Sequence, residues 1–385
     1  MKIAIFHNFM DNIGGAEIVA LTLARELEAD IYTTNIDFLK IEKMGFSDVR
    51  PRINSIGRLP KKAPFRQQLA LFKFRRLNLS GRYDFFIIAG DWAMSGAVNN
   101  HPNIWYAHSP LNELWAFTDF ISKQVISFWK RPIYKVWLSY NRWLTRKYAK
   151  KIDHWVCNSE NTKNRIKKYY YQEATVIYPP IDLGPDLNYE EINERAKKDG
   201  AENYWLSVNR LVTHKRIEKQ IAAFASMPDK KLIIIGSYEK GVYQFEKYKK
   251  FLKSIKPENV EIKHWLSNNE LKELYANCKG LITTAKNEDF GMTVIEAMAQ
   301  GKPVIAPNEG GYKESVLDRK TGILLSSLEP QTIVKAITEI ENNLENNPSF
   351  YQSACRLRAE DFSTNVFITK IKKIIHDSGK GTKKT

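Results

Sequence analysis

Residues 288–303, EDFGMTVIEAMAQGKP, follow the apolar run LITT at 281–284. The run predicts a buried strand, and the segment after it predicts a loop, a helix that begins near Met292 and a Gly-Lys-Pro stop. A loop that enters a helix presents unpaired N–H groups and the positive end of the helix dipole, which suit a diphosphate. Glu288 and Glu296 lie on this segment, and carboxylates accept hydrogen bonds from paired sugar hydroxyls. Two solvated charges near a helix start are the simpler alternative.

The same strand, turn and helix pattern runs through the whole chain in two series. Strands that alternate with helices predict an α/β fold with mostly parallel sheets, whose strands end at a ligand-binding edge. Residues 178–182, YPPID, interrupt the pattern before a polar and acidic stretch, so we place a domain junction there. The expected strands are residues 2–7, 85–89, 104–106, 155–157 and 175–177 in the first series and 205–208, 231–235, 260–263, 280–284 and 303–306 in the second.

The composition is that of a folded basic protein. The chain has 385 residues, 43% of them hydrophobic, and 59 Lys+Arg against 43 Asp+Glu give a net charge of +16. This length predicts two domains that each bury a core, which argues against disorder. The three cysteines are far apart and form no CxxC pair, so we expect neither a disulfide framework nor a thiolate metal site. With no signal peptide and no long apolar run in the sequence, we expect a cytoplasmic protein.

The excess positive charge is concentrated in the first half of the chain. Residues 57–82 hold eight basic and no acidic side chains, and residues 120–152 hold nine basic and none acidic, interleaved with aromatic residues. Such segments suit an anionic membrane surface, whereas helices that pack their aromatics inward are the plainer alternative. A nucleic-acid-binding protein is a different class of function with the same charge, but no recognition motif accompanies it. The predicted membrane contacts are Lys73, Arg75, Arg76, Trp129, Lys130 and Arg131.

Three other places carry residues suited to a ligand. Arg210 and Lys215 follow the first strand of the second series, where both can reach an anion, although a basic surface cluster is equally simple. The Gly14-Gly15 pair after the first strand allows close approach of a ligand, but it is neither a GxGxxG fingerprint nor a P-loop. His108 follows a strand, although a lone histidine is more often structural than functional.

These residues lie within motifs that resemble a known family. The spacing of Glu288 and Glu296 resembles the E-x7-E signature of the retaining glycosyltransferases of family 4, which have the GT-B fold. In the first half, IGGAE, WYAHSP and CNSENTKNRIKKYY with ATVIYPPID are similar to the first domain of that family. In the second half, NRLVTHKRIE, LIIIGS, HWLSNNELKELYANC and NEGGYKESVLDRKTGILL are similar to its second domain. WYAHSP and VIYPPID resemble mannosyltransferases of surface polysaccharide or lipid-linked glycan synthesis.

The resemblance implies a role for each of these residues. Arg210 and Lys215 match the pair that neutralises the donor diphosphate, Glu296 matches the ribose ligand, and Glu288 matches the carboxylate that meets sugar hydroxyls. His108 matches a histidine near the transferred sugar. Gly14 and Gly15 match a turn near the phosphates and the acceptor. The donor-binding loop is matched by Phe290, Gly291, Met292 and Thr293.

The resemblance also implies an architecture and a reaction. We expect two Rossmann-like domains facing a cleft, residues 1–182 on the acceptor side and 183–350 on the donor side. Residues 351–377 are expected to form a helix crossing back to the first domain, followed by a disordered tail at 378–385. The expected reaction is metal-independent, retaining transfer of a hexose, mannose from GDP-mannose, to a lipid-linked acceptor at the inner face of the membrane. The alternatives are a UDP-sugar donor and a sugar-nucleotide-binding protein without activity.

Overall fold

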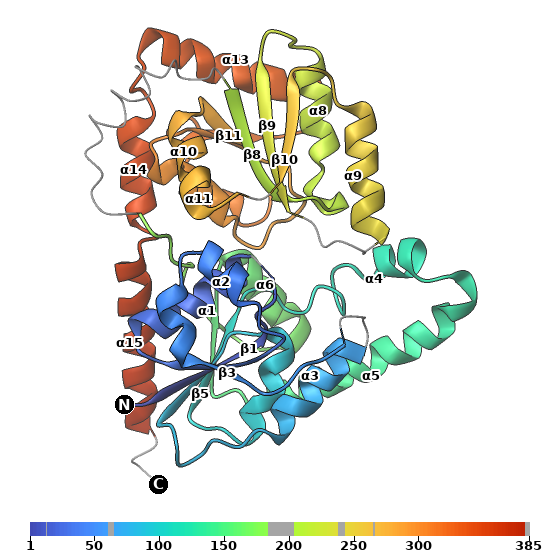
Figure 1. Ribbon diagram of the computed structural model, residues 1–385, viewed down its shortest axis with the longest axis vertical. Helices are drawn as coiled ribbons and strands as arrows, with labels where there is room; N and C mark the ends of the chain where they lie inside the picture. The colour runs from blue at the N-terminus through green and yellow to red at the C-terminus, as the bar shows by residue number, and fades with distance from the viewer. Residues whose placement is uncertain (13, 61–64, 184–203, 238–242, 265, 382–385) are drawn as a thin grey trace. The chain divides into compact units, whose positions relative to one another are not determined.

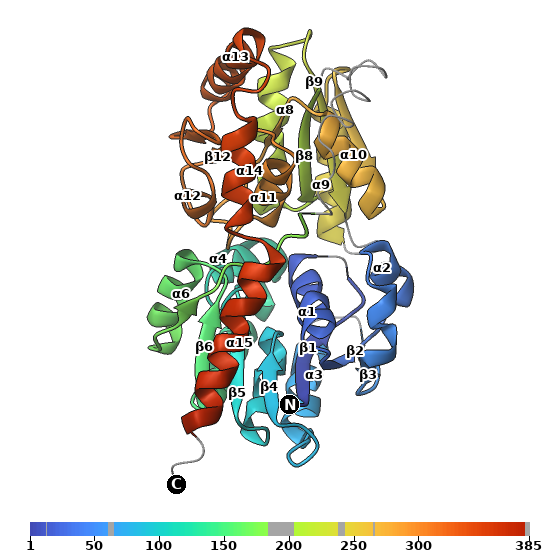
Figure 2. The ribbon, with the colours of Figure 1, turned by 90° about the vertical axis from the view of Figure 1, so that its left-hand side faces the viewer.

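The computed structural model describes residues 1–12, 14–60, 65–183, 204–237, 243–264 and 266–381. It divides the chain into two compact units, one formed by residues 1–180 and 365–385 and the other by residues 181–364. The chain passes into the second unit after Pro180 and returns to the first after Thr364. Figure 1 shows the elements of each unit, and Figure 2 shows them from a second direction.

The first unit is built on a seven-stranded sheet in which every neighbouring pair is parallel, in the order β3-β2-β1-β4-β5-β6-β7. The central strands are buried apolar runs, as expected for a sheet covered on both faces. Its strands are β1 Ile3–Phe9, β2 Asp30–Thr34, β3 Ile53–Ser55, β4 Phe85–Ile88, β5 Asn103–Ala107, β6 His154–Cys157 and β7 Thr175–Val176.

Helices cover both faces of this sheet because alternate strand residues point to opposite sides. Trp105 packs with Trp155 in the core cluster beneath α3 and α5, whereas its neighbour Tyr106 meets Phe367 of α15 on the other face. The α-helices are α1 Gly15–Glu26, α2 Phe38–Lys43, α3 Phe65–Arg76, α4 Thr118–Phe120, α5 Arg131–Ala149, α6 Glu160–Tyr170 and α15 Thr364–Gly381. Shorter turns of helix are η1 Ser47–Arg52, η2 Asp91–Val98, η3 Ile121–Val125 and η4 Phe128–Lys130.

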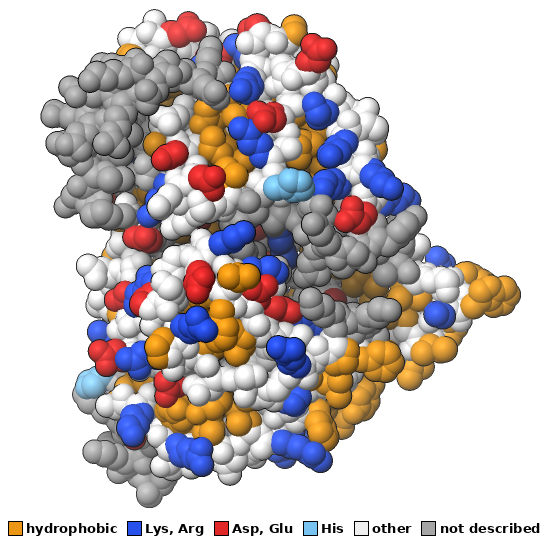
Figure 3. Space-filling view, in the orientation of Figure 1, with side chains coloured by type: hydrophobic (Ala, Val, Ile, Leu, Met, Phe, Trp, Pro, Cys, Tyr) orange, Lys and Arg blue, Asp and Glu red, His pale blue; other side chains and the backbone are white. Residues whose placement is uncertain are grey.

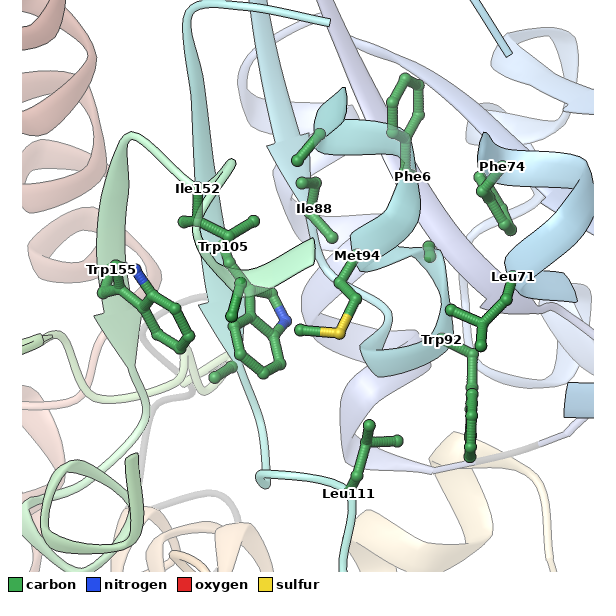
Figure 4. Packing of buried hydrophobic residues seen from close by; sticks show 14 of the residues in the cluster. Phe6, Leu71, Phe74, Ile88, Trp92, Met94, Trp105, Leu111, Ile152 and Trp155 are labelled. Atoms are coloured by element: carbon green, nitrogen blue, oxygen red, sulfur yellow. The ribbon is translucent and has the colours of Figure 1, made fainter. Parts of the chain in front are cut away.

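The core of the first unit is rich in large aromatic side chains (Figure 4). Phe6 of β1 contacts Phe74 of α3 and Phe86 of β4, with ring centroids 5.9 and 5.7 Å apart. These rings, together with Trp92 and Trp105, are buried. Each large buried side chain contributes roughly 1.5–3 kcal/mol, so the core fixes one face of α3 against the sheet.

The second unit has a six-stranded parallel sheet in the order β10-β9-β8-β11-β12-β13. Its strands are β8 Tyr204–Arg210, β9 Lys231–Ser237, β10 Val260–His264, β11 Gly280–Ile282, β12 Val304–Pro307 and β13 Gly322–Leu325. The helices are η5 Thr213–Lys215, α8 Ile217–Ala225, α9 Tyr243–Ile255, α10 Asn268–Asn277, α11 Met292–Ala299, α12 Tyr312–Ser315, α13 Pro330–Asn346 and α14 Gln352–Glu360. The expected parallel α/β architecture is therefore correct for both halves.

The structure differs from the sequence prediction at several elements. The strands β2, β3 and β13 were not predicted, because β2 and β3 are short with polar residues and β13 is a four-residue edge strand. Residues 351–377 do not form one helix: α14 belongs to the second unit, and α15 begins at Thr364 after a short turn. The predicted disordered tail was also placed too early, since α15 continues to Gly381, and residues 382–385 lie outside the described part of the chain.

Candidate active site

The two loops expected to bind the donor lie at one edge of the second sheet. β8 and β11 are parallel neighbours, and the chain leaves β8 toward β9 on one side while β11 lies on the other. Such a reversal of strand order is the usual ligand-binding position in open α/β sheets. Thr284, just after β11, donates its hydroxyl to the carbonyl of Lys215 at 2.8 Å, and Lys286 N–H donates to the carbonyl of His214 at 2.7 Å. The two loops are thus fastened together.

Lys215 and Glu288 form an ion pair across these loops. Lys215 Nζ lies 2.6 Å from Glu288 Oε2, and both side chains are largely buried, with exposures of 12% and 22%. Burial acts to raise the pKa of Glu288, but the positive charge of Lys215, with help from His214 and Arg210, brings that pKa below its ordinary value. Glu288 is therefore an anion near neutral pH, held beside the cation predicted to bind phosphate.

Arg210 stands at the end of β8 with its side chain exposed, close enough to Glu288 to contribute to that lowered pKa. Its neighbour Asn209 is buried and donates a hydrogen bond to Ser207 Oγ at 2.9 Å. The structure thus brings Arg210, Lys215 and Glu288 to the same loop edge, as predicted, with Arg210 free to extend toward solvent.

The loop that follows Glu288 ends at the N-terminus of α11, which begins at Met292 as expected. Its cap residue Gly291 has φ +92°, a conformation that favours glycine, and an added Cβ would lie 2.5 Å from the ring of Tyr312. No side chain of the described residues caps this helix, so the backbone N–H groups of Met292 and Thr293 lie at its positive end. Phe290 is buried and packs against Phe362, so it anchors the loop.

Glu296 lies in the second turn of α11 and accepts a hydrogen bond from the hydroxyl of Tyr275 at 2.7 Å. Burial raises the pKa of Glu296, and the bond from Tyr275 and the charge of Lys272 only partly oppose the rise. The structure therefore places Glu288 and Glu296 at different ends of the same segment, one paired with a cation and the other with a phenol.

Sequence reasoning missed the residues that brace this loop. Arg216, at φ +50°, donates Nε to the carbonyl of Thr284 at 2.7 Å and Nη2 to the carbonyl of Ala285 at 3.1 Å, and it forms an ion pair with Glu309. Next to Glu309, an added Cβ on Gly310 would lie 2.5 Å from the carbonyl oxygen of Glu288. The quoted segments NRLVTHKRIE and NEGGYKES carried these residues, but no spacing rule distinguished them from surface charges.

In the first unit, Gly14 is the N-cap of α1, and Gly15 is its first residue. His108 follows β5, where Asn158 donates an amide hydrogen bond to its backbone carbonyl at 2.8 Å. Burial is the main reason that the pKa of His108 falls to about 3, with a further contribution from His7, so the imidazole is neutral at physiological pH. Gly14, Gly15 and His108 therefore lie beside the carboxyl ends of strands of the first sheet.

The predicted membrane contacts do not all reach the surface. Lys73 Nζ donates a hydrogen bond to the carbonyl of Ile56 at 2.8 Å, and Arg75 Nη1 donates to Asn99 Oδ1 at 3.2 Å. Arg76 and Lys130 are exposed, Trp129 is 85% exposed, and Arg131 is half-buried, with Nε bonded to the carbonyl of Ser122. Lys73 and Arg75 are therefore partly buried and bonded within the first unit. The sequence pattern does not show which face of α3 packs inward.

The described residues contain neither a candidate metal cluster nor a helix that could span a membrane. No three His, Cys, Asp or Glu side chains gather there into a candidate metal site. No helix in the same part of the chain is long and apolar enough to cross a membrane.

Two parallel α/β units, one with a donor loop built around an E-x7-E segment, define a GT-B glycosyltransferase. The model of Glycosyltransferase Family 4 matches residues 13–184, and that of Glycosyl transferases group 1 matches residues 188–355. Between them the two models account for most of the chain, which belongs to the group 1 and family 4 glycosyltransferases.

Relatives and solved structures agree with this assignment. The α-1,3/1,6-mannosyltransferase ALG2 of Candida glabrata is 26% identical, over 95% of this chain and 92% of its own length. The corresponding Neurospora crassa protein is 27% identical, over 86% of this chain and 81% of its own. Anabaena HepE in complex with UDP-glucose superposes with a TM-score of 0.72 at 17% identity, over 98% of this chain and all of that one. At this identity the superposition shows the fold alone.

Proposed function

We propose that the protein transfers mannose from GDP-mannose to a lipid-linked glycan with retention of anomeric configuration. The observation that carries the proposal is the Lys215–Glu288 pair beside the N-terminus of α11, because a sugar diphosphate needs both cationic and hydroxyl-binding groups. The assignment of the sugar and the acceptor rests on the names of the relatives. Two are named α-1,3/1,6-mannosyltransferases, and a Dictyostelium discoideum relative, 26% identical over 55% of this chain and 45% of its own, is named for GDP-Man and a PP-Dol-linked glycan.

The chemistry follows from charge development on the leaving group. The bond from C1 of mannose to the β-phosphate oxygen of GDP breaks, and a bond from C1 to an acceptor hydroxyl oxygen forms on the same face. The hydroxyl proton passes to the departing phosphate oxygen. Arg210, Lys215 and the N–H groups of Met292 and Thr293 stabilise the diphosphate charge, so we propose that no metal or other cofactor is required. Glu288 holds sugar hydroxyls, Glu296 holds the ribose and His108 lies near the transferred sugar.

Lys215 has a double role in this scheme. Before the donor binds, the Lys215 ammonium neutralises Glu288. When the donor binds, its diphosphate also pairs with Lys215 or takes the place of Glu288 as the partner of Lys215. Glu288 is released toward the sugar as the cation turns to the phosphate. In the absence of donor, the ion pair thus keeps both buried charges neutralised. In its presence, Lys215 binds the diphosphate and Glu288 binds the sugar.

A membrane surface for the acceptor is supported by the faces of α3 and α5. On α5, residues at helical spacing expose apolar side chains, and α3 carries a similar stripe; Figure 3 shows hydrophobic side chains gathered over these helices. Gln68 of α3 donates to Asn141 of α5 at 2.6 Å, so the two stripes belong to one packed surface. The exposed members are Phe65, Leu69 and Phe72 on α3, Phe128 and Trp129 on η4, and Ile133, Val136, Tyr140 and Trp143 on α5. We call this set the α3–α5 face.

Basic side chains border the α3–α5 face. Arg76 lies over the ring of Phe72 at 3.9 Å, Arg131 over Phe128 at 5.6 Å and Lys147 over Trp143 at 5.5 Å. Aromatic and aliphatic residues with such a cationic border suit the headgroup boundary of an anionic bilayer. A second copy of the chain would place bases against bases, since residues 120–152 contain no acid. We therefore propose a peripheral location on the cytoplasmic face of the membrane and no nucleic-acid partner.

One ion pair connects α3 with the loop that precedes α1. Arg66, near the start of α3, lies 2.5 Å from Asp11, and its guanidinium stacks on Phe9 at 3.7 Å. The loop that leads to Gly14 is therefore braced by the same helix that carries part of the α3–α5 face. This supports an acceptor-binding region next to the membrane-contacting helices.

Thermal-shift screening against GDP, GDP-mannose, UDP and UDP-sugars tests the donor. GDP and GDP-mannose should raise the melting temperature, and Lys215→Met should abolish the rise. Stabilisation by UDP-sugars alone would replace the donor assignment, and stabilisation by neither class would contradict it. Turnover by the stabilising donor separates a transferase from a protein that only binds sugar nucleotides.

Vesicle flotation tests the membrane contact. The full chain should float with vesicles of anionic phospholipid, and Ile133→Glu with Val136→Glu should prevent it. Leu357→Glu is the matched control, because Leu357 is an equally exposed hydrophobic residue on α14 of the second unit. Equal flotation of the double variant and the control would contradict the proposal. A loss of dimers in the double variant, with flotation unchanged, would assign the face to a second copy.

A further inference from the structure

A polar cluster that sequence reasoning did not identify lies at the carboxyl edge of the first sheet. The order β2-β1-β4-β5 reverses between β1 and β4, the position where open α/β sheets bind ligands. His7 lies near the end of β1, Glu17 lies in the first turn of α1, and His108 follows β5. The chain that leaves β4 lies beside this end of β1, since Gly90 N–H donates to the carbonyl of Phe6 at 3.1 Å.

The three side chains are close to one another. His7 Nε2 lies 3.8 Å from Glu17 Oε1. His7 and Glu17 are also near enough to influence the pKa of His108, His7 lowering it and Glu17 raising it. A Cβ added to Gly14 would lie 2.8 Å from Glu17 Oε2, so this carboxylate covers the glycine turn. The cluster therefore contains Gly14 and His108, which the sequence analysis singled out, together with His7 and Glu17, which it did not.

Two buried nitrogens of the cluster lack a hydrogen-bond partner among the residues that the structure describes. His7 is only 3% exposed, and within the residues that the structure describes neither its Nδ1 nor His108 Nε2 has a partner. A buried polar atom without a partner is destabilising, and such orphans need an explanation. Groups of a ligand that donate or accept hydrogen bonds would satisfy both atoms.

The polar groups of the cluster indicate which kind of ligand it can bind. Glu17 brings a carboxylate to the start of α1, next to the Gly14 turn. A carboxylate and two imidazoles offer hydrogen-bond acceptors and donors in one place, which suits the neighbouring hydroxyls of a sugar ring.

We propose that His7 and Glu17, together with His108, form a hydroxyl-binding subsite for a sugar ring in the first unit. The proposal rests on the sugar transfer proposed above and adds two binding residues to it. The sugar belongs either to the acceptor or to the donor, and both present the same hydroxyl chemistry.

The test compares Glu17→Gln and His7→Gln with Glu26→Gln, an exposed change in the last turn of the same helix. Kinetics with GDP-mannose and octyl α-mannoside as a soluble acceptor give KM for each substrate. Each variant should raise one KM by about 10- to 100-fold, as expected for a lost hydrogen bond to a charged group. A raised acceptor KM assigns the sugar to the acceptor, and a raised GDP-mannose KM assigns it to the donor.

Binding measurements keep the proposal separate from the transfer reaction. Saturation-transfer NMR with octyl α-mannoside should show signals with the wild type and Glu26→Gln. These signals should weaken in Glu17→Gln and His7→Gln if the sugar is the acceptor's, whereas for a donor sugar the GDP-mannose affinity of the same variants should fall instead, even if no turnover is found. GDP affinity should be unchanged, which also confirms that the variants are folded. Unchanged NMR signals and unchanged KM values in folded Glu17→Gln and His7→Gln would overturn the subsite.

Discussion

Lys215 Nζ lies 2.6 Å from Glu288 Oε2, so the cation predicted for the diphosphate and the carboxylate predicted for the sugar neutralise each other. Glu288→Gln keeps the size of the side chain but removes its charge. We expect kcat to fall by about 100-fold or more, the usual effect of losing a preorganised polar contact in the transition state. GDP affinity should stay the same or increase, because Lys215 is no longer shared.

Lys215→Met is the matched variant for this pair. It should weaken GDP binding, measured by calorimetry, because the diphosphate loses a cation. Weaker GDP binding in Glu288→Gln than in Lys215→Met would contradict the division of roles between the two residues.

Tyr275→Phe should shift the pH dependence of donor binding. The Tyr275 hydroxyl stabilises the charged form of Glu296, whose pKa burial already raises above the ordinary 4.5. Donor affinity should fall as the pH drops through this raised pKa and the carboxylate that holds the ribose becomes protonated. Removal of the hydroxyl raises the pKa further, so the decline should begin at higher pH in Tyr275→Phe. Titration of GDP affinity against pH checks this, and an identical profile for both proteins would contradict it.

Arg216→Gly should separate positioning from stability. Glycine adopts φ +50° without the strain of about 1 kcal/mol or more that other residues have there, which offsets part of the lost bonding. The carbonyls of Thr284 and Ala285 and the carboxylate of Glu309 lose their shared partner, so the Glu288 loop loosens. We expect kcat to fall about tenfold or more with a small change in melting temperature. Unchanged kcat in Arg216→Gly would show that the contacts do not position the loop.

Glu341→Gln should destabilise the second unit. Glu341 of α13 is buried and accepts hydrogen bonds from Trp205 Nε1 at 3.0 Å, from Lys279 Nζ at 3.0 Å and from Lys230. Loss of these charge-assisted bonds should reduce the free energy of unfolding by roughly 2 kcal/mol. Glu339→Gln is the control, because its exposed pair with Arg319 contributes under about 1 kcal/mol.

The stability from Glu341 should also depend on pH. Burial acts to raise its pKa, but the bonds from Lys230, Trp205 and Lys279 outweigh burial and leave the pKa below 4.5. A carboxyl with a lowered pKa in the folded state stabilises the protein above its unfolded pKa, and this contribution is lost as the pH falls through the folded value. Urea unfolding should therefore show the wild type and Glu341→Gln converging below pH 4.5. A constant difference down to low pH would contradict this.

The sequence predicted most of the second unit's site because its chemistry is local. Glu288, Gly291 and Met292 follow one another on a loop and a helix start, and Arg210 and Lys215 flank a single turn, so periodicity and spacing place them. The braces Arg216 and Glu309 are 93 residues apart and meet only through the parallel order of the strands. His7 and Glu17 reach His108 for the same reason, since β1 and β5 are separated by β4. Contacts set by strand order leave no local pattern in the sequence.

For the basic segments, the sequence predicted the helices but not which of their residues are exposed. Counting charge pointed to α3 and α5, which do expose apolar and basic side chains, but it named Lys73 and Arg75, which bond within the first unit. The exposed stripe of α3 contains Phe65 and Phe72, whereas Phe74, two positions on from Phe72, is buried against Phe6. Helical periodicity reveals two faces, and only the packing against η2 and the sheet decides which one is outside.

The proposed reaction is tested most directly by the anomeric configuration of its product. The full chain is incubated with GDP-mannose and a polyprenyl-diphosphate-linked oligosaccharide, and the isolated glycan is examined by NMR. We predict one GDP released for each mannose transferred and an α-linked mannose, because the donor linkage is α and same-face displacement retains it. A β-linked product, or transfer from a UDP-sugar with none from GDP-mannose, would contradict the account.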